Sequence, residues 1–313
     1  MTRWAASDMP DQTGRTVVVT GANSGLGLRS AEALARRGAA VVLACRDVGR
    51  AEAARAGVAA AATGPAPTVV VLDLADLASV RKAADEIAER CGRIDVLMNN
   101  AGVMAPPLQR TADGFEMQFG TNHLGHFALT GLLLPALLRA EGPRVVTTSS
   151  LMHRRSDDRW DDPNAELRPY ERWTAYGRSK LANLLFMREL ARGARDAGRD
   201  LVSVAAHPGY AATHLQRTTA RHTGGWLVSH VAGAMVAVGS RVVAQSDAAG
   251  ALPQLYAATM PDVASGDYFG PGGPFEVRGA PARVAMARAA RDDTAARRLW
   301  ALSEDLTGVT YPW

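Results

Sequence analysis

The sequence has little cysteine. Its 313 residues include two, Cys45 and Cys91. Their spacing fits neither a metal-ligand motif nor a disulfide framework. We therefore expect a reduced, intracellular protein and predict a cytoplasmic location.

Long apolar runs are also missing. The longest candidate, residues 226–238, contains His230 and falls short of the roughly 18 to 20 residues that a membrane-spanning helix needs. Residues 1–15 lack the apolar core of a signal peptide. No integral membrane segment is expected, and the stretch 226–238 is either part of a lid or a membrane or subunit contact.

Blocks of basic charge are absent too. The chain carries 35 Lys and Arg against 31 Asp and Glu, a net charge of +4, and the basic residues are scattered. No basic block is interleaved with aromatic residues, so nucleic acid is not an expected partner. Hydrophobic residues make up 47% and charged residues 21%, which is typical of a soluble globular protein.

What the sequence does contain is a Gly-rich turn between a strand and a helix. Residues 15–20 form a β-branched run typical of a buried strand, and residues 28–37 favour a helix. Gly21, Gly25 and Gly27 lie between them. Glycine lets the backbone approach a pyrophosphate closely, and a helix N-terminus offers it free N–H groups. An ordinary turn is the alternative, but three glycines at this spacing favour phosphate binding.

The alternation of strand and helix continues along the chain. Further strands are predicted at residues 39–44, 68–72, 94–98, 144–148 and 201–206, with a last short strand within 267–275. This pattern predicts an α/β fold, a single-domain doubly wound parallel sheet of Rossmann type over residues 1–313 with helices on both faces. Its chemistry is expected at the carboxyl ends of the strands.

Tyr176 and Lys180 lie four residues apart in a segment rich in helix formers. On a helix this spacing puts both side chains on one face. An ammonium group stabilises a nearby phenolate, so we expect Lys180 to lower the pKa of Tyr176, which can then act as a general acid or base. Such pairs are also common on solvated helices. The nucleotide motif upstream and Ser150, at the end of the preceding strand, favour the catalytic interpretation.

The segment Thr20 to Gly27 reads T-G-x-x-x-G-x-G, and this fingerprint resembles that of the short-chain dehydrogenase/reductase family. Matching motifs extend from Thr20 to Thr213, roughly two-thirds of the chain. The resemblance implies a nicotinamide dinucleotide as cofactor. The residues of this turn that it assigns to cofactor binding are Gly21, Asn23, Ser24, Gly25, Leu26 and Gly27.

The resemblance favours NADP over NAD. In the family, an arginine directly after the end of the second strand marks NADP users, and Arg46 occupies that position. Asp47 follows it, and we expect this residue to cap the next helix. Asp73 and Leu74 would lie along the adenine ring, although capping of the following helix is an equal alternative for Asp73.

Two further family motifs would line the cofactor groove. An NNAG motif ends the fourth predicted strand, and a Pro-Gly-x-x-x-Thr segment follows the sixth. Small residues at strand ends allow close approach of the cofactor. The residues assigned from these motifs are Asn100, Ala101, Gly102, Pro208, Gly209 and Thr213. The threonine would grip the nicotinamide carboxamide.

The resemblance also assigns the catalytic residues. Tyr176 would transfer the proton, and Tyr176 and Lys180 would both bind the cofactor, with Lys180 holding the nicotinamide ribose. Ser150 would hydrogen-bond the substrate oxygen. Ser149 is the alternative to Ser150, because alternation along a strand lets only one of the two serve. Asn122 matches the family's relay asparagine, which supports a water near the lysine through its backbone.

Two other features bear on the site. His123 and His126 could be mistaken for metal ligands, but no third ligand completes a site, so we interpret them as helix-face residues and expect no metal. Residues 151–173 are polar and contain two prolines, so we expect a loop or loosely structured insertion. A substrate lid is expected at about 210–240, where Gly224-Gly225 forms either an ordinary turn, the safer interpretation, or a hinge. The insertion and the TNHLGHF segment resemble the retinol-dehydrogenase-like and protochlorophyllide-reductase-like branch.

We therefore predict an NADP-dependent oxidoreductase that transfers a hydride between nicotinamide and the carbonyl or alcohol group of a medium-sized, fairly apolar small-molecule substrate. One alternative is a non-catalytic NADP-binding sensor or scaffold. Another is a light-dependent tetrapyrrole reductase, although neither cysteine is placed as its proton donor. Family members often pair through the helices that contain Asn122 and Tyr176, so the resemblance is compatible with a homo-oligomer.

Overall fold

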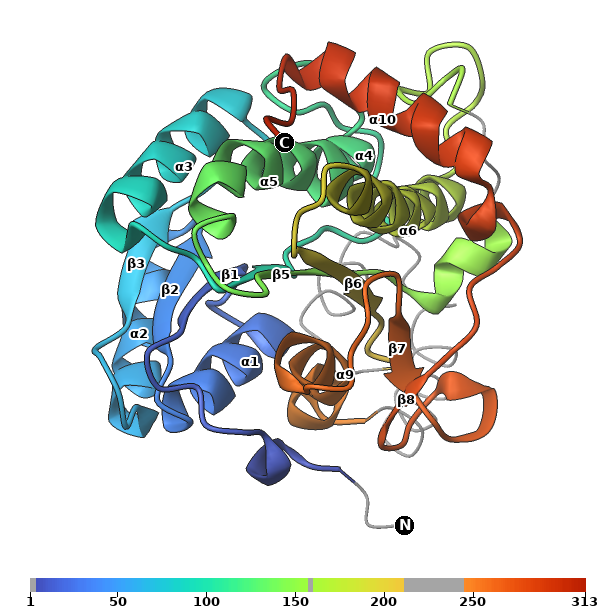
Figure 1. Ribbon diagram of the computed structural model, residues 1–313. Helices are drawn as coiled ribbons and strands as arrows, with labels where there is room; N and C mark the ends of the chain where they lie inside the picture. The colour runs from blue at the N-terminus through green and yellow to red at the C-terminus, as the bar shows by residue number, and fades with distance from the viewer. Residues whose placement is uncertain (1–3, 157–159, 211–244) are drawn as a thin grey trace, which may run out of the picture.

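Runs of valine and other β-branched residues form the inner strands, as the hydrophobic pattern predicts. The computed structural model describes residues 4–156, 160–210 and 245–313. Its strands are β1 (Thr16–Thr20), β2 (Ala40–Cys45), β3 (Thr68–Val71), β4 (Val96–Asn99), β5 (Arg144–Thr148), β6 (Val202–Ala206), β7 (Tyr268–Pro271) and β8 (Pro281–Arg283). They form one sheet in the order β3-β2-β1-β4-β5-β6-β7-β8 (Figure 1).

The sheet is parallel from β3 to β7, and β8 pairs antiparallel with β7. This arrangement confirms the predicted α/β fold with a doubly wound parallel sheet. The sequence analysis missed β8, because none of its three residues is fully buried and no apolar run signals it. The last short strand predicted within residues 267–275 is β7, which ends at Pro271; Phe275 lies beyond it with a φ of 53°.

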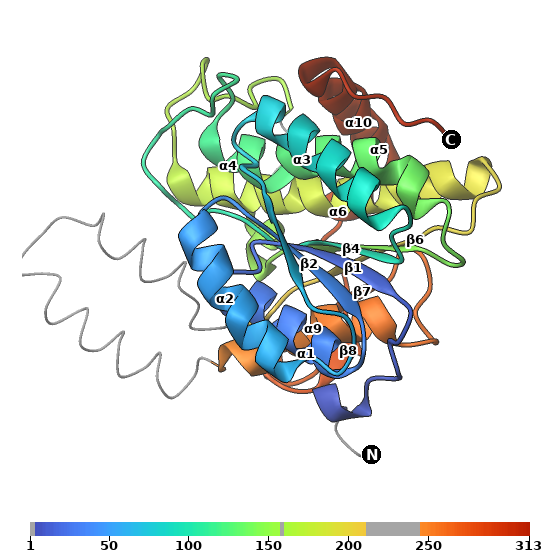
Figure 2. The same ribbon diagram turned by 90° about the vertical axis from the view of Figure 1, so that its left-hand side faces the viewer.

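Helices cover both faces of the sheet. They are α1 (Gly25–Arg36), α2 (Val48–Ala61), α3 (Leu77–Cys91), α4 (Met117–Phe119), α5 (Gly125–Leu137), α6 (Arg172–Asp196), α9 (Asp247–Thr259) and α10 (Asp293–Thr307). Helices α1, α2 and α9 lie on one face, and α3, α5 and α6 lie on the other, with α10 outside them (Figures 1 and 2). A π-helical turn, Gly120–Leu124, joins α4 to α5.

Alternate side chains of the inner strands pack on opposite faces. On β1, Val17 and Val19 join the core beneath α1 and α9, whereas Val18 joins the core beneath α3 and α5. Because both faces are covered, the strand is a continuous apolar run rather than an alternating one. This explains why the sequence signals the inner strands clearly.

Side-chain oxygens cap the helices that follow the strands. Asp47 accepts a hydrogen bond from the backbone N of Arg50, which confirms its predicted capping of α2. The alternative that Asp73 caps the following helix is wrong. Asp76 is the N-cap of α3 and accepts from the backbone N of Ala78 at 2.9 Å. Asp73 instead stays in the loop that follows β3.

The described parts of the segment predicted as an insertion, residues 151–156 and 160–173, pack against the rest of the molecule. Asp162 is buried and accepts a hydrogen bond from the backbone N of Glu166 at 2.7 Å. The ring of Trp160 stacks on that of Phe119, with centroids 6.1 Å apart. Of the two predicted forms, a loop or a loosely structured insertion, the described part of this segment is the loop: it consists mainly of turns and a short 3-10 helix, and side chains such as Asp162 satisfy its local backbone.

Several predictions concern residues that the structure does not describe. The predicted lid, residues 210–240, lies outside the described residues except for Tyr210, as do Gly224-Gly225 and the apolar stretch 226–238. The single-domain assignment of residues 1–313 stays a prediction. In the part of the chain that is described, no helix is both long and apolar enough to cross a bilayer.

An aromatic cluster joins α5 to the C-terminal segment. Phe127 is fully buried on α5, and its ring centroid lies 5.0 Å from those of Trp300 and Tyr311. The Tyr311 hydroxyl donates a hydrogen bond to the backbone oxygen of Phe127 at 2.8 Å. The cluster therefore anchors α10 and the C-terminal residues to the helix that follows Asn122.

We predict that Phe127→Ala lowers the free energy of unfolding by about 3 to 5 kcal/mol, because the truncation leaves a cavity among these rings. Chemical denaturation followed by circular dichroism measures the change. Phe275→Ala is the control: Phe275 is 90% exposed, so its loss should change the stability by less than about 0.5 kcal/mol. Equal destabilisation by both variants would contradict this packing.

Candidate active site

The Gly-rich turn after β1 packs directly against the segment that follows β4. Gly27 has no space for a side chain, since a Cβ there would lie 2.5 Å from Asn100 Nδ2 and 2.5 Å from the Gly21 oxygen. Asn100 Nδ2 donates to the backbone oxygen of Thr20 at 2.8 Å. Gly21 has a φ of 66°, and a Cβ there would lie 3.0 Å from that of Ala101. The two predicted cofactor motifs therefore form one surface.

The start of α1 offers N–H groups at this surface. Ser24 is the N-cap residue, yet its side chain accepts no hydrogen bond from the N–H groups of the described helix. Asn23, Gly25 and Leu26 beside it are partly exposed. A helix N-terminus without a side-chain cap suits an anionic group such as a pyrophosphate.

The ends of β2 and β3 bring Arg46 and Asp73 together. The Arg46 side chain is 71% exposed, and its Nη1 lies 3.9 Å from the Asp73 carboxylate. An exposed ion pair at this distance contributes little to stability, so Arg46 can turn toward a ligand at small cost. Leu74 is 7% exposed and packs against Gly125 of α5. The Asp73 side chain, which is 33% exposed, is more accessible to a ligand.

Tyr176 and Lys180 lie on one face of α6, as their spacing predicts. The Lys180 Nζ is 5.8 Å from the centroid of the Tyr176 ring and donates to the backbone oxygen of Thr148, at the end of β5, at 3.2 Å. A Cβ on Gly102 would lie 3.4 Å from the same Nζ. The Tyr–Lys pair and the NNAG segment therefore meet at the carboxyl edge of the sheet.

Burial controls the protonation of this pair. It raises the pKa of Tyr176 to about 12, and a hydrogen bond with the Ser150 side chain opposes this rise in pKa. Burial also lowers the pKa of Lys180 to about 8. The pKa of Tyr176 is therefore raised overall and not lowered as predicted, because desolvation of the phenolate outweighs any stabilisation by the ammonium 5.8 Å from the ring centroid. Tyr176 is therefore protonated at neutral pH.

Ser149 and Ser150 have different partners at the end of β5, as alternation along a strand predicts. The buried Ser149 hydroxyl donates to the backbone oxygen of Lys180 at 2.8 Å. Ser150 hydrogen-bonds Tyr176 and also accepts from the backbone N of Met152 at 3.2 Å, where it caps a short 3-10 helix. Ser150 is thus the serine beside the phenol.

Asn122 is fully buried in the π-helical turn. Its Oδ1 accepts from the backbone N of Val103 at 2.7 Å, and its Nδ2 donates to the backbone oxygen of Val103 and to Ser179 Oγ, each at 2.9 Å. Ser179 in turn donates to the backbone oxygen of Tyr176 at 2.8 Å. The Asn122 side chain therefore links the segment after β4 to the turn of α6 that carries Tyr176.

The segment after β6 belongs to a cluster of polar side chains around the buried His207 that the sequence analysis missed. His207 Nδ1 accepts from the backbone N of Gly209 at 3.1 Å, so its Nε2 donates to Glu276, also at 3.1 Å. Arg154, just beyond Ser150, donates to both oxygens of that carboxylate at 2.7 and 2.8 Å. This cluster fastens the Pro-Gly segment to the loop after Ser150. Because Arg154 and Glu276 are 122 residues apart, no local pattern signals their contact.

Gln254 on α9 is another supporting residue that the sequence analysis missed. Its Nε2 donates to Ser30 Oγ at 2.8 Å and to Asn100 Oδ1 at 3.2 Å, and its Oε1 accepts from Thr148 Oγ1 at 3.1 Å. One buried side chain therefore joins α1, β5 and the segment after β4. The sequence does not indicate that Gln254 is buried, because polar residues on a helix usually face solvent.

Thr213 lies outside the described residues, while Pro208 and Gly209 are described and partly exposed just after β6. Within the described parts of the chain, no group of three or more His, Cys, Asp or Glu is arranged to hold a metal ion. His123 and His126 are both buried in the helical region rather than lying on its surface, so their interpretation as ordinary helix-face residues is incomplete.

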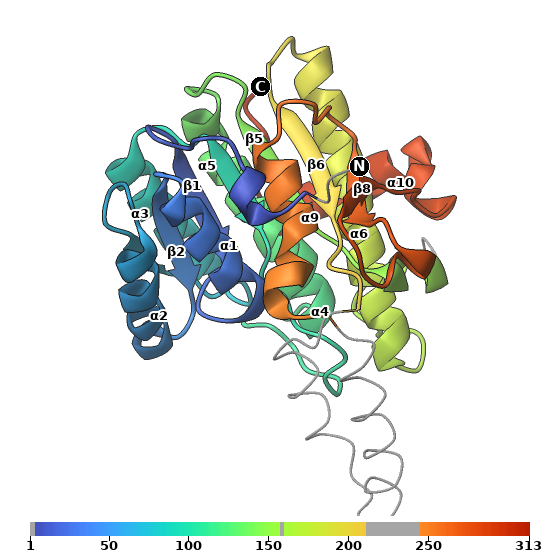
Figure 3. The same ribbon diagram turned by 90° about the horizontal axis from the view of Figure 1, so that it is seen from below.

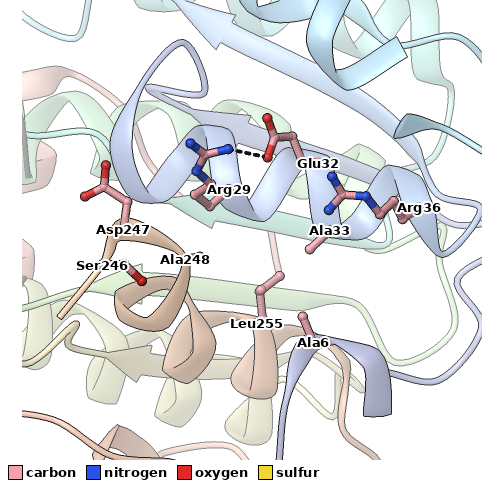
Figure 4. A pocket seen from close by; sticks show the side chains of 9 residues that line it. All are labelled: Ala6, Arg29, Glu32, Ala33, Arg36, Ser246, Asp247, Ala248 and Leu255. Atoms are coloured by element: carbon pink, nitrogen blue, oxygen red, sulfur yellow. Dashed lines mark hydrogen bonds and ion pairs between the residues drawn. The ribbon is translucent and has the colours of Figure 1, made fainter. Parts of the chain in front are cut away.

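A surface pocket of about 490 Å³ opens between α1 and α9, away from these residues (Figure 4). The two helices lie side by side on one face of the sheet (Figure 3). Arg29 and Glu32, both from α1, form an ion pair at 2.8 Å in the pocket lining. None of the residues assigned to the site lines this pocket, so it is separate from the candidate active site.

Comparison with known proteins agrees with this geometry. A family model described as short chain dehydrogenase matches residues 15–224. The chain belongs to the short-chain dehydrogenase/reductase family of oxidoreductases. The matched range contains the Gly-rich turn, the NNAG segment and the Tyr176–Lys180 pair, which the structure brings together at one edge of the sheet.

Curated relatives of this chain include retinol dehydrogenases. Human retinol dehydrogenase 13 is 42% identical over 301 residues, which cover 96% of this chain and 86% of the relative. Human retinol dehydrogenase 14 is 40% identical over 311 residues, with 95% and 87% covered. These similarities confirm the retinol-dehydrogenase-like resemblance inferred from the motifs.

Solved structures share the fold. A crystal structure of an uncharacterized protein from Mycobacterium paratuberculosis is 44% identical, covers 100% of both chains and has a TM-score of 0.81. A short chain dehydrogenase from Shigella flexneri, complexed with NADP, is 22% identical with a TM-score of 0.63 and covers 82% of this chain and 96% of its own. The second similarity supports the fold alone.

We predict that mild acid destabilises the folded protein. Burial lowers the pKa of His126 and the pKa of His207 to about 4 each, so the unfolded chain binds these protons more readily between about pH 6.5 and pH 4. The stability present above this window is lost as the pH falls through it. Thermal unfolding at about pH 7.5 and about pH 5 measures the loss.

A variant that removes one of these titrations provides the control. His207→Gln should show a smaller change in Tm between the two pH values, because one proton fewer is taken up on unfolding. A Tm that is unchanged or higher at the lower pH would contradict the assignment of neutral, buried imidazoles.

Proposed function

We propose that this protein is an NADP-dependent oxidoreductase that transfers a hydride between nicotinamide and the carbonyl or alcohol carbon of a medium-sized, apolar substrate. The observation that carries the proposal is the meeting of Ser150, Tyr176 and Lys180 beside Gly102 at the carboxyl edge of the sheet. A proton donor, a hydrogen-bond donor and a cation next to a nucleotide-binding surface are the groups that such a reaction requires from the protein.

The protonation of Tyr176 suits carbonyl reduction. With a pKa of about 12 it keeps its proton at neutral pH and can pass it to a carbonyl oxygen on which negative charge develops. Ser150 would donate a hydrogen bond to the same oxygen. Lys180, with a pKa of about 8, stays mostly cationic at neutral pH and would stabilise the phenolate that remains. In alcohol oxidation the same groups would act in reverse.

The cofactor, when bound, supplies or accepts the hydride. The N–H groups at the start of α1, which Ser24 leaves without a side-chain cap, suit its pyrophosphate. Arg46, exposed at the end of β2, is placed to bind a 2′-phosphate, which supports NADP. Gly102 leaves space beside Lys180, and the lysine would hold the nicotinamide ribose.

Exposed apolar side chains near the carboxyl edge of the sheet support the proposal of an apolar substrate. The large hydrophobic side chains that are exposed in the described chain all lie at the carboxyl ends of strands β2 to β7 or in the connections that leave them. They are Val48, Val71, Leu108, Leu167, Trp173, Tyr210 and Phe275. The names of the curated relatives make a retinoid the first substrate to test.

We predict that Tyr176→Phe lowers kcat by about 100-fold to 10,000-fold, because the substrate oxygen loses its proton donor. The Kd for NADPH should rise by no more than about 10-fold, because the cofactor loses at most one hydrogen bond. NADPH absorbance, followed with retinal and a panel of aldehydes and ketones, measures turnover. Tyr256→Phe is the control. Tyr256 lies on α9, its hydroxyl donates to Asp262 at 2.9 Å, and it has no role in the proposed reaction.

Each other outcome of this experiment points to a specific alternative. Retained turnover in Tyr176→Phe would contradict the proton-donor assignment. Binding of NADPH by the wild-type protein without turnover of any substrate in the panel would favour a sensor or scaffold. Activity that depends on illumination would favour reduction of a tetrapyrrole.

We predict that Arg46→Ala raises the Kd for NADPH by about 10-fold to 150-fold and leaves the Kd for NADH unchanged, because only the 2′-phosphate loses its charged donor. Isothermal titration calorimetry with both nucleotides measures the change. Arg55→Ala is the control, since Arg55 lies on α2 and pairs with Glu52 at 2.6 Å. Equal weakening of both nucleotides by Arg46→Ala would show that Arg46 does not read the phosphate.

A further inference from the structure

His126 lies where the nucleotide-binding and catalytic parts of the candidate site meet, yet the proposed reaction gives it no role. It is 1% exposed and belongs to the first turn of α5, directly after the π-helical turn. Its Nε2 lies 2.9 Å from Thr20 Oγ1 at the end of β1. Its Nδ1 lies 3.0 Å from the backbone oxygen of Asn122. One imidazole ring therefore spans the distance between the Gly-rich turn and Asn122.

The partners of His126 determine which ring nitrogen carries the proton. The backbone oxygen of Asn122 can only accept, so Nδ1 must donate. The Thr20 hydroxyl accepts from the backbone N–H groups of the two residues that follow β4, each at 2.9 Å, which occupies both lone pairs. The Thr20 hydroxyl therefore donates its own proton to His126 Nε2, 2.9 Å from Thr20 Oγ1. The backbone oxygen of Met98, at 3.2 Å, is the more distant acceptor. Burial, which lowers the pKa of His126 to about 4, agrees with a neutral ring.

His123 provides a contrast within the same helical region. It is equally buried, but its Nε2 lies 2.8 Å from Ser303 Oγ on α10, and its ring stacks on Phe119 with centroids 5.3 Å apart. These partners belong to the packing of α4 and α10. The hydrogen-bond partners of His126, in contrast, belong to the candidate site.

We propose that His126 is a positioning residue that couples the nucleotide-binding turn to the catalytic helix. This inference rests on the proposed function for its effect on turnover. Toward β1, Nε2 holds the Thr20 hydroxyl in the orientation that binds the segment after β4. Toward α5, Nδ1 holds the backbone of Asn122, whose side chain binds Ser179 and so supports the turn of α6 that carries Tyr176.

The two ring nitrogens have separable effects. Without the Nε2 acceptor, the Thr20 hydroxyl can turn away from its present orientation, and the segment that lines the cofactor groove loses support. Without the Nδ1 donor, the buried oxygen of Asn122 loses a partner, and the asparagine can shift relative to Lys180. The first change weakens nucleotide binding, and the second slows turnover.

Nitrogen-15 NMR of the histidine rings tests the geometry in the wild-type protein. We expect His126 to be the neutral tautomer with its proton on Nδ1 at neutral pH, and saturating NADP⁺ to shift its ring signals more than those of His123. The spectrum of His126→Asn assigns the signals. A charged ring, a proton on Nε2 or equal shifts for both histidines would overturn the proposal.

Three variants test the coupling. His126→Asn keeps a short donor near the Asn122 oxygen and loses the Nε2 acceptor, His126→Leu loses both groups, and His123→Leu is the matched control. Calorimetry should show a Kd for NADPH raised about 5-fold to 10-fold in both His126 variants. The kcat with retinal should fall about 10-fold in His126→Leu and be partly restored in His126→Asn. His123→Leu should lower the Tm without changing either constant.

The outcomes separate this inference from the proposed function. If His126→Leu binds NADPH and turns over retinal as His123→Leu does, His126 is a packing residue only. If the wild-type protein binds no NADPH, the proposed function is wrong, and the NMR tautomer still decides the hydrogen bonding of His126. If it binds NADPH but does not reduce retinal, the Kd values of the variants decide the coupling.

Discussion

The close approach of the ends of β1 and β4 is the constraint on which the candidate site depends. A Cβ on Gly27 would lie 2.5 Å from Asn100 Nδ2, so the Gly-rich turn and the NNAG segment can meet only with glycine at that position. Parallel pairing of the two strands brings their carboxyl ends to the same edge of the sheet. The Thr20 hydroxyl then binds the two backbone N–H groups after β4. The order of the strands in the sheet therefore determines that these two motifs form one surface.

Burial at this edge also determines the chemistry of the side chains. Desolvation disfavours the charged form of each group, so it raises the pKa of Tyr176 and lowers those of Lys180 and His126. The tyrosine therefore holds its proton, and the histidine stays neutral and can donate at one nitrogen while accepting at the other. In a solvated site the pKa values of the same groups would return toward 10.0, 10.5 and 6.5.

Support for the site comes from segments that are distant in the sequence. Gln254 reaches from α9 to Asn100, and Glu276 reaches from the β7–β8 connection to Arg154 and His207. Each of these side chains fixes loops that leave different strands. The rigidity of the edge is thus shared among the first strand, the last strands and the helices on both faces of the sheet.

The sequence by itself determined the features that depend on neighbours along the chain. The β-branched run of β1, the glycines after it, the spacing of Tyr176 and Lys180 and the capping residue Asp47 each act within a few residues, and the structure has them as expected. The resemblance favoured Ser150 over Ser149, and the structure has Ser150 beside the phenol. The tertiary structure alone decided in which direction the pKa of Tyr176 moves and that His126 joins Thr20 to Asn122. These outcomes depend on burial and on partners as many as 106 residues apart, which no local pattern encodes.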